Sequence, residues 1–210
     1  MRAIPSGHLK KWETWIFTIV SASLLVLAAF KLNPLAFRLS PLALVVIMLY
    51  SYTKRFTSLS HFWLGISLAI SPIGAWIAIK GQFDILPILL GLAVMFWTAG
   101  FDIIYACQDF NFDKRKGLHS IPVKLGIRVS LWISSGMHIF TVCILISIGI
   151  ISELGSTYLT GVGIVMAILI YEHAIVKPDD LSRVNLAFFT LNGTVSLVLM
   201  VLSIADLLMT

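Results

Sequence analysis

The sequence predicts an all-α, polytopic transmembrane bundle of about seven helices in a single domain spanning residues 1–210. Two observations support this prediction. Of the 210 residues, 59% are hydrophobic and 12% are charged, and the mean hydropathy is +0.97. A water-soluble domain does not need so much apolar surface. The apolar residues also gather in seven stretches, each approaching the roughly 20 residues that a membrane-spanning helix requires.

The seven predicted spans are separated by short connections that hold most of the charges. The spans are Trp15–Phe30, Pro41–Tyr52, Phe62–Ile79, Ile85–Cys107, Ser130–Ile151, Tyr158–Val176 and Leu186–Leu208. The second span is short, and it can extend upstream through Leu39 or downstream through Thr53. Helices are predicted rather than barrel strands because the apolar runs lack an alternation of period two.

The basic residues predict how the bundle is oriented. With seven spans, all Lys and Arg except Lys31, Arg38 and Lys80 lie on the side that bears the N-terminus. By the positive-inside rule, that side is the cytoplasm, and we expect an integral protein of a bacterial inner membrane. The formal charge of +5 indicates no nucleic-acid partner, because the charges lie in connections between spans. The two cysteines predict neither a disulfide framework nor a zinc site.

One segment, Phe101–Gly126, combines carboxylates and cations at the end of an apolar stretch. It holds Asp102, Asp109 and Asp113, followed at once by three basic residues at 114–116. If the helix continues that far, Asp109 and Asp113 lie within about 20° of Asp102 around its axis. Carboxylates stacked in this way repel one another, so a cation should neutralise them. Hard oxygen ligands favour Mg²⁺ over zinc or copper.

The alternative is an ordinary polar connection between two spans. In that interpretation, aspartates and lysines solvate each other, and Gly117 ends the helix after a basic last turn. Spacing alone leaves both interpretations open.

Several charged segments are expected at the same cytoplasmic end of the bundle. They include the carboxylates, the pair Lys54 and Arg55, and the connection from Lys177 to Arg183. A charged substrate with an apolar tail could bind there, its head in water and its tail among the helices. For Lys10, Lys11 and Lys177, a role in topology alone is the simpler explanation.

Other polar residues lie inside the spans, and each has two explanations. Glu172 and His173 lie near the cytoplasmic end of their helix and are either functional or hydrogen-bonded to a neighbouring helix. His138 is more simply explained as an interhelical contact. Asn185 and Asn192 either line a pocket or join helices.

The residues from Asp102 through Tyr105, Asp109 and Asp113 to Gly126 resemble a known motif. It is the second aspartate-rich motif, with its following loop, of the UbiA superfamily of intramembrane prenyltransferases. The branch that acts on 4-hydroxybenzoate is the most similar. Three further stretches resemble the same branch: Arg2–Gly7, Tyr50–Thr57, and Tyr171–His173 continuing to Asn192.

Members of that superfamily have about nine transmembrane helices and two aspartate-rich motifs. The first motif, Asn-x-x-x-Asp-x-x-x-Asp, precedes the segment that resembles Arg2–Gly7, and it is absent from these 210 residues. We therefore expect a chain shortened by two helices, as a truncated form or a shortened paralogue. We expect little or no transferase activity from this chain alone, because half of the metal-binding carboxylates are missing.

The resemblance implies Mg²⁺-dependent transfer of a polyprenyl group from a polyprenyl diphosphate to an aromatic acid, such as 4-hydroxybenzoate in ubiquinone biosynthesis. Two alternatives are a sister branch that uses another aromatic acceptor in menaquinone biosynthesis, and an inactive paralogue or membrane assembly partner. The implied catalytic residues are Asp109 and Asp113, as metal ligands, with Lys54 and Arg55. The implied substrate-binding residues are Asp102, Tyr105, Arg115, His119, Arg2, Tyr50 and Asn192.

Overall fold

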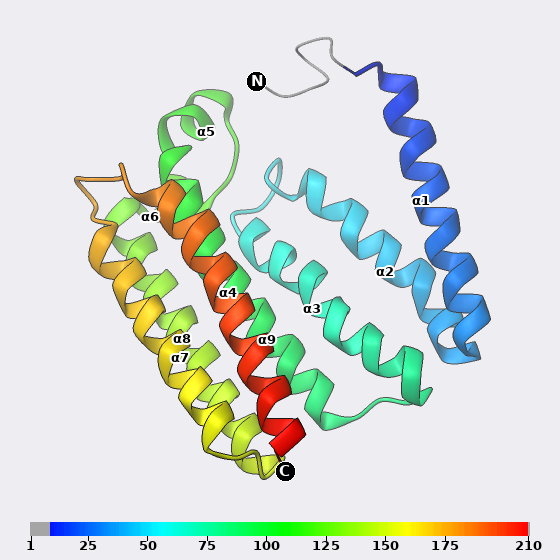
Figure 1. The fold of residues 1–210 in the computed structure, drawn as a ribbon. Coiled ribbons are helices and arrows are strands. Elements are labelled where there is room, and N and C mark those ends of the chain that lie inside the picture. Colours follow the sequence, from blue (N-terminus) through cyan, green and yellow to red (C-terminus); the bar gives the residue numbers. More distant parts are fainter. Residues whose placement is uncertain (1–8, 210) are drawn as a thin grey trace.

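The computed structural model describes residues 9–209, and within that range the long elements are all helices (Figure 1). Seven segments are long and apolar enough to cross a membrane, which confirms the predicted number. They are α1 (Lys11–Leu32), α2 (Pro34–Thr53), α3 (Ser60–Lys80), α4 (Ile85–Gln108), α7 (Ile127–Ile151), α8 (Ser156–Ile175), and a last segment formed by the π-helix η1 (Leu186–Leu191) and α9 (Asn192–Met209). Two short helices, α5 (Phe110–Lys116) and α6 (Ile121–Leu125), connect α4 to α7.

Helix α2 begins at Pro34, well before the Pro41 expected from hydropathy. Proline suits a first helical position because it has no N–H to leave unpaired, and Asn33 caps the turn by accepting the N–H of Ala36 at 2.9 Å. Inside the helix, Pro41 cannot donate to the carbonyl of Phe37. The hydroxyl of Ser40 donates to that carbonyl at 2.9 Å, so the helix continues past the proline.

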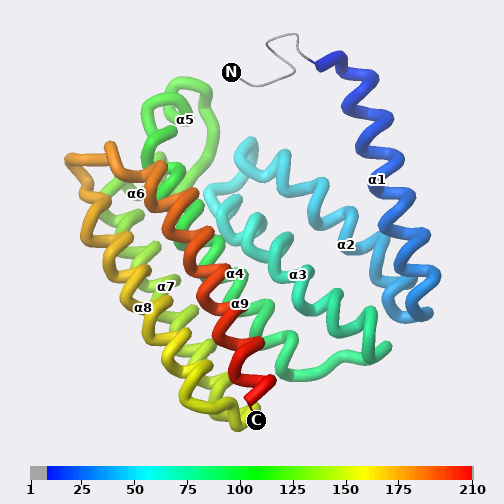
Figure 2. The backbone as a smooth tube through the Cα atoms, in the orientation of Figure 1, coloured from blue at the N-terminus to red at the C-terminus, as the bar shows by residue number. Residues whose placement is uncertain are grey.

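Helix α4 is the central element of the bundle and packs most extensively against α3 and α7 (Figures 1 and 2). It has ten buried residues, whereas α1 has one. Small residues allow the close approach. A Cβ atom at Gly65 of α3 would collide with the backbone of Met95, and one at Gly100 would collide with the ring of His138.

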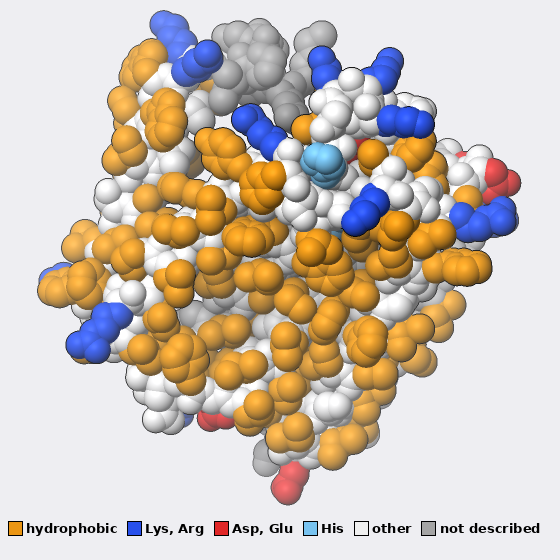
Figure 3. Space-filling view, turned by 180° about the vertical axis from the view of Figure 1, so that it is seen from behind, with side chains coloured by type: hydrophobic (Ala, Val, Ile, Leu, Met, Phe, Trp, Pro, Cys, Tyr) orange, Lys and Arg blue, Asp and Glu red, His pale blue; other side chains and the backbone are white. Residues whose placement is uncertain are grey.

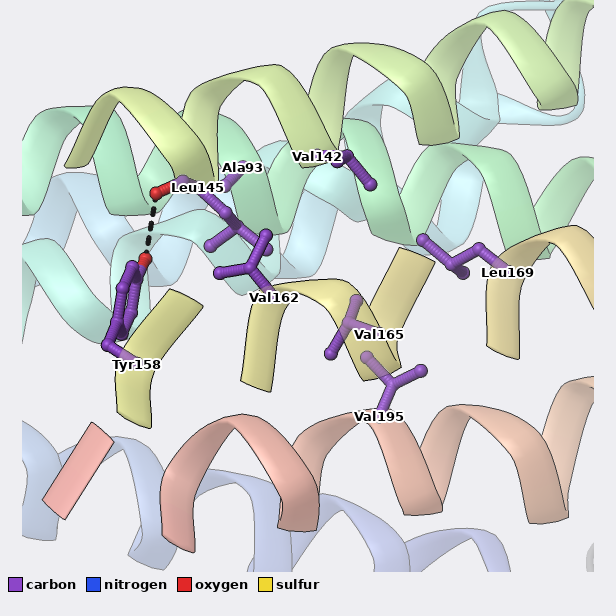
Figure 4. Close-up of a cluster of buried hydrophobic side chains, with 8 residues drawn as sticks. All are labelled: Ala93, Val142, Leu145, Tyr158, Val162, Val165, Leu169 and Val195. Atoms are coloured by element: carbon purple, nitrogen blue, oxygen red, sulfur yellow. Dashed lines mark hydrogen bonds between the residues drawn. The ribbon is translucent and has the colours of Figure 1, made fainter. Parts of the chain in front are cut away.

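One cluster of buried apolar side chains joins four helices. It consists of Ala93, Val142, Leu145, Tyr158, Val162, Val165, Leu169 and Val195 (Figure 4). The hydroxyl of Tyr158 donates to the carbonyl of Leu145 at 2.9 Å. The buried phenol group of Tyr158 is therefore hydrogen-bonded, and the apolar side chains of α4, α7, α8 and α9 exclude solvent around it.

On the face that Figure 3 shows, the surface around the middle of the bundle is apolar. Ile79 and Leu208 are 83% and 82% exposed, an exposure that lipid tolerates and water opposes. Lys and Arg side chains gather at the end that carries α5 (Figure 3). The start of α1, the connections on either side of α5, and the connection from α8 to η1 share that end (Figure 1), as the alternation of spans predicts.

Replacing Gly65 with alanine should destabilise the bundle by about 1–3 kcal/mol, because the added methyl group meets backbone rather than a movable side chain. Gly74 is the matched control in the same helix, since a Cβ atom there has nothing within 4 Å. Thermal unfolding in detergent should show a lower midpoint for Gly65→Ala than for Gly74→Ala. Equal midpoints would contradict the proposed close contact between α3 and α4.

Candidate active site at the end of α4

The segment expected to carry the chemistry folds into the end of α4, helix α5, a short loop and α6. α4 ends at Gln108, Asp109 adopts φ −84° and ψ 0°, and α5 begins at Phe110. α5 ends at Gly117, whose φ of +63° is a left-handed conformation that favours glycine. The helix end at Gly117 after a basic turn, which belonged to the alternative interpretation of an ordinary polar connection, is present in the structure.

Asp113 is the buried residue of α5, and it forms an ion pair. Its Oδ2 lies 3.1 Å from Nζ of Lys54, and the two side chains are 2% and 31% exposed. The loop that follows α5 also contacts Lys54, because the N–H of His119 donates to the carbonyl of Lys54 at 2.7 Å. The end of α2 is thus joined to α5 by a side-chain contact and to the following loop by a backbone contact.

Asp102 lies on α4 and faces the start of α3. Its Oδ2 lies 2.7 Å from Nδ1 of His61, whose side chain is fully buried. The other ring nitrogen of His61, Nε2, accepts the N–H of Ile121 at 3.4 Å. His61 is absent from the site residues predicted from the sequence, although it immediately precedes the predicted span Phe62–Ile79.

The three aspartates do not form the single stripe that a continuous helix would give. The helix is interrupted at Asp109, Asp102 pairs with His61, and Asp113 pairs with Lys54. Among residues 9–209, no group of three or more His, Cys, Asp or Glu side chains is placed to hold a metal. Two of the three carboxylates thus already have side-chain partners, Lys54 for Asp113 and His61 for Asp102.

Asp109 and Asp113 nevertheless suit Mg²⁺ as two of its ligands. Asp109 and Asp113 are four residues apart on either side of the start of α5, and both offer carboxylate oxygens. Mg²⁺ commonly takes one or two protein carboxylates and completes its octahedron with waters and substrate phosphates. Two aspartates therefore fit such an ion without a third protein ligand.

The other predicted cations lie exposed at the same end. The guanidinium of Arg55 lies 5.3 Å from the ring centroid of Tyr52, and Nε of Arg115 donates to the carbonyl of Asn111 at 3.2 Å. The side chain of His119 is exposed, and that of Tyr50 is half-buried. Arg2 lies outside the described residues.

Tyr105 and Asn192 belong to an aromatic and amide cluster between α4 and η1. The ring of Tyr105 lies 4.4 Å from that of Phe188. Asn192 accepts from Nε1 of Trp97 at 2.8 Å and donates to the carbonyl of Ala187 at 3.0 Å. The polar atoms of Asn192 therefore contact protein, and the side chain joins α4 to η1.

The histidines of α7 and α8 form a separate interhelical contact. Nε2 of His173 lies 3.0 Å from Nδ1 of His138, and Nδ1 of His173 lies 3.2 Å from the hydroxyl of Ser135. Glu172 is buried, with Oε2 4.0 Å from Nδ1 of His138. For His138 and His173, these contacts correspond to the helix-joining explanation.

Comparison with known proteins shows to which family the chain belongs. Residues 1–194 match the UbiA prenyltransferase family. The chain belongs to that family. It is 27% identical over 191 residues to a 4-hydroxybenzoate octaprenyltransferase of Aeromonas hydrophila, covering 91% of this chain and 66% of that protein. A protein of the same name from Paraburkholderia phytofirmans is 29% identical, with 84% and 61% covered. The chain thus spans roughly two thirds or less of the length of these curated relatives.

Two solved structures share the UbiA-family fold. A UbiA homologue from Aeropyrum pernix K1, determined in the apo form, superposes with a TM-score of 0.86 at 30% identity, covering 96% of this chain and 75% of that one. A digeranylgeranylglyceryl phosphate synthase superposes with a TM-score of 0.75 at 19% identity, covering 98% and 73%. The second likeness concerns the fold alone. Together these matches confirm the resemblance inferred from the aspartate-rich motif.

Removing Lys54 should destabilise this UbiA-family protein, because it leaves the buried carboxylate of Asp113 unpaired. The loss for a fully buried pair is about 3–5 kcal/mol, and we expect about 1–3 kcal/mol since Lys54 is partly exposed. The measurement is the thermal unfolding of Lys54→Met, with Lys116→Met on exposed α5 as its control. Adding Asp113→Leu to Lys54→Met should restore part of the loss, and a further loss would contradict the ion pair.

Proposed function

We propose that this protein transfers a polyprenyl group from a polyprenyl diphosphate to an aromatic acid such as 4-hydroxybenzoate, in ubiquinone biosynthesis. The observation that carries the proposal is the buried pair of Lys54 and Asp113, next to Asp109, at the polar end of an apolar bundle. The names of the curated relatives agree with this substrate class. The site would lie at the cytoplasmic face of a bacterial inner membrane, where the basic connections are expected.

Asp109 and Asp113 would hold Mg²⁺ in this proposal. When bound, the ion neutralises diphosphate charge and makes the diphosphate a better leaving group. Lys54, Arg55 and Arg115 supply further positive charge at the same end for the departing diphosphate. The allylic carbon–oxygen bond breaks, and the ring carbon ortho to the acceptor hydroxyl forms the new bond and releases its proton.

The apolar bundle would protect the reaction from water while it holds the prenyl tail. Asp102, Tyr50, Tyr105 and His119 are the proposed substrate contacts among the described residues. Arg2 is a further candidate for an anionic group of the substrate. Asn192 would act from a distance, because its amide already contacts Trp97 and the carbonyls of η1.

Two alternatives to this proposal can be separated experimentally. A related enzyme of menaquinone biosynthesis would use a different aromatic acceptor, so 4-hydroxybenzoate would not compete with the true acceptor. A non-catalytic assembly partner would bind no prenyl diphosphate in a metal-dependent way.

Replacing either metal-binding carboxylate should abolish transfer. We expect Asp109→Ala and Asp113→Ala to lower kcat by about 10²-fold or more, the scale of losing one stabilising group for transition-state charge. The measurement is radiolabelled prenyl transfer in membranes that contain the natural protein, with Asp179→Ala in the exposed connection after α8 as the control. Wild-type rates in both variants would remove the assignment of these metal ligands.

Chelation should stop the reaction without unfolding the protein. EDTA is expected to abolish both prenyl transfer and binding of a non-reactive prenyl thiodiphosphate, and excess Mg²⁺ should restore both, because the ion offsets the repulsion between carboxylates and diphosphate. Binding that is unchanged by EDTA would contradict the Mg²⁺ site. Metal-dependent binding without any transfer would instead favour the assembly partner.

A further inference from the structure

His61 lies in the first turn of α3 with no exposed surface, and both of its ring nitrogens are occupied. Nδ1 lies 2.7 Å from Oδ2 of Asp102 on α4. Nε2 lies 3.4 Å from the backbone nitrogen of Ile121 at the start of α6. One buried ring therefore connects three segments that are distant in sequence.

The two partners determine where the proton of the ring resides. A backbone N–H can only donate, so Nε2 must present its lone pair to Ile121. The proton of the neutral ring then lies on Nδ1 and is donated to the carboxylate of Asp102. With both nitrogens engaged and no access to solvent, His61 cannot accept a proton from a substrate as a general base. Its effect on the site must be positional.

The contact with Ile121 extends this effect to the opposite side of the site. Ile121 follows His119 by two residues, and the N–H of His119 donates to the carbonyl of Lys54 at 2.7 Å. Lys54 in turn holds Asp113 at 3.1 Å. The ring thus fixes Asp102 through one nitrogen and, through the other, the loop that contacts the Lys54–Asp113 pair.

We propose that His61 is a positioning residue of the active site, which sets the orientation of the Asp102 carboxylate and anchors the loop at 118–121. The side chain of Asp102 is 13% exposed whereas that of His61 is fully buried, so Asp102 is the member of the pair that can reach a substrate. This inference rests on the proposed prenyl transfer, in which Asp102 contacts the substrate.

Two substitutions separate the bonds of His61. In His61→Asn, the amide nitrogen lies near the position of Nδ1 and can still donate to Asp102. In His61→Gln, the amide oxygen lies near the position of Nε2 and can still accept from Ile121, but the bond to Asp102 is lost. We expect His61→Gln to lower kcat about tenfold or more, the lower end of the range for losing an outer hydrogen bond at a polar site, and His61→Asn to stay within about threefold.

A double variant tests whether the loss acts through Asp102. The effects of His61→Gln and Asp102→Asn should not add, because both remove the same oriented carboxylate. Wild-type kcat in a folded His61→Gln protein, or full additivity, would overturn the proposal.

A second measurement needs no activity. The sequence has five histidines, and ring-¹⁵N-histidine spectra of the wild-type and folded His61→Gln proteins differ by the signals of one ring, which identifies the ring nitrogens of His61 in the wild-type spectrum. The ¹⁵N spectrum should show a protonated Nδ1 and an unprotonated Nε2. A protonated Nε2 would overturn the hydrogen-bond assignment. Absence of transfer by the natural protein would count against the proposed function, while the ¹⁵N spectrum would still decide the assignment for His61.

Discussion

The absence of water in a bilayer core is the constraint on which this structure depends, since an unpaired polar group there costs several kcal/mol. It explains why the spans are helices, and why backbone groups that lack a partner within their own helix are hydrogen-bonded by a nearby side chain. Ser40 supplies a donor to the Phe37 carbonyl that Pro41 cannot reach. At the opposite end of the bundle, buried Asp206 of α9 accepts the N–H groups of Gly155 and Tyr158 at 2.7 and 3.1 Å. The start of α8 is therefore capped by another helix.

The same constraint shapes the candidate active site. Asp113 and Asp102 lie where the apolar bundle meets the polar connections, and each is paired, with Lys54 and His61 respectively. Carbonyl groups of the π-helix η1 are also paired, because Asn192 donates to the carbonyls of Ala187 and Phe188. π-Helical turns often occur near functional sites, and here one brings Phe188 against Tyr105, which lies between Asp102 and Asp109 in sequence.

Hydropathy was sufficient to predict the spans because lipid imposes a length on each of them. It failed at the start of α2, where Arg38 and Ser40 interrupt the apolar run although the helix continues through them. The aspartate-rich segment was identified from residue types and a family resemblance, but its geometry was not. Nothing at Asp109, neither glycine nor proline, indicates that the helix breaks there.

The pairings in the site could not be predicted for a different reason. His61 and Asp102 are 41 residues apart, and Lys54 and Asp113 are 59 apart. Whether His61 meets Asp102 depends on how closely α3 packs on α4, and hence on small residues such as Gly65. Whether Lys54 meets Asp113 depends on how the end of α2 lies against α5. A helical pattern describes one helix at a time, so it assigns the carboxylates to one face without showing which neighbour neutralises each of them.

Lys54 can serve both the fold and the proposed chemistry. An ammonium group has three N–H donors, and the contact with Oδ2 of Asp113 uses one of them. The side chain remains 31% exposed, so the other donors can face a diphosphate while the buried carboxylate stays compensated. Asp113 can therefore be buried in the folded protein and still belong to a site that binds an anion, because its charge is balanced before the substrate arrives.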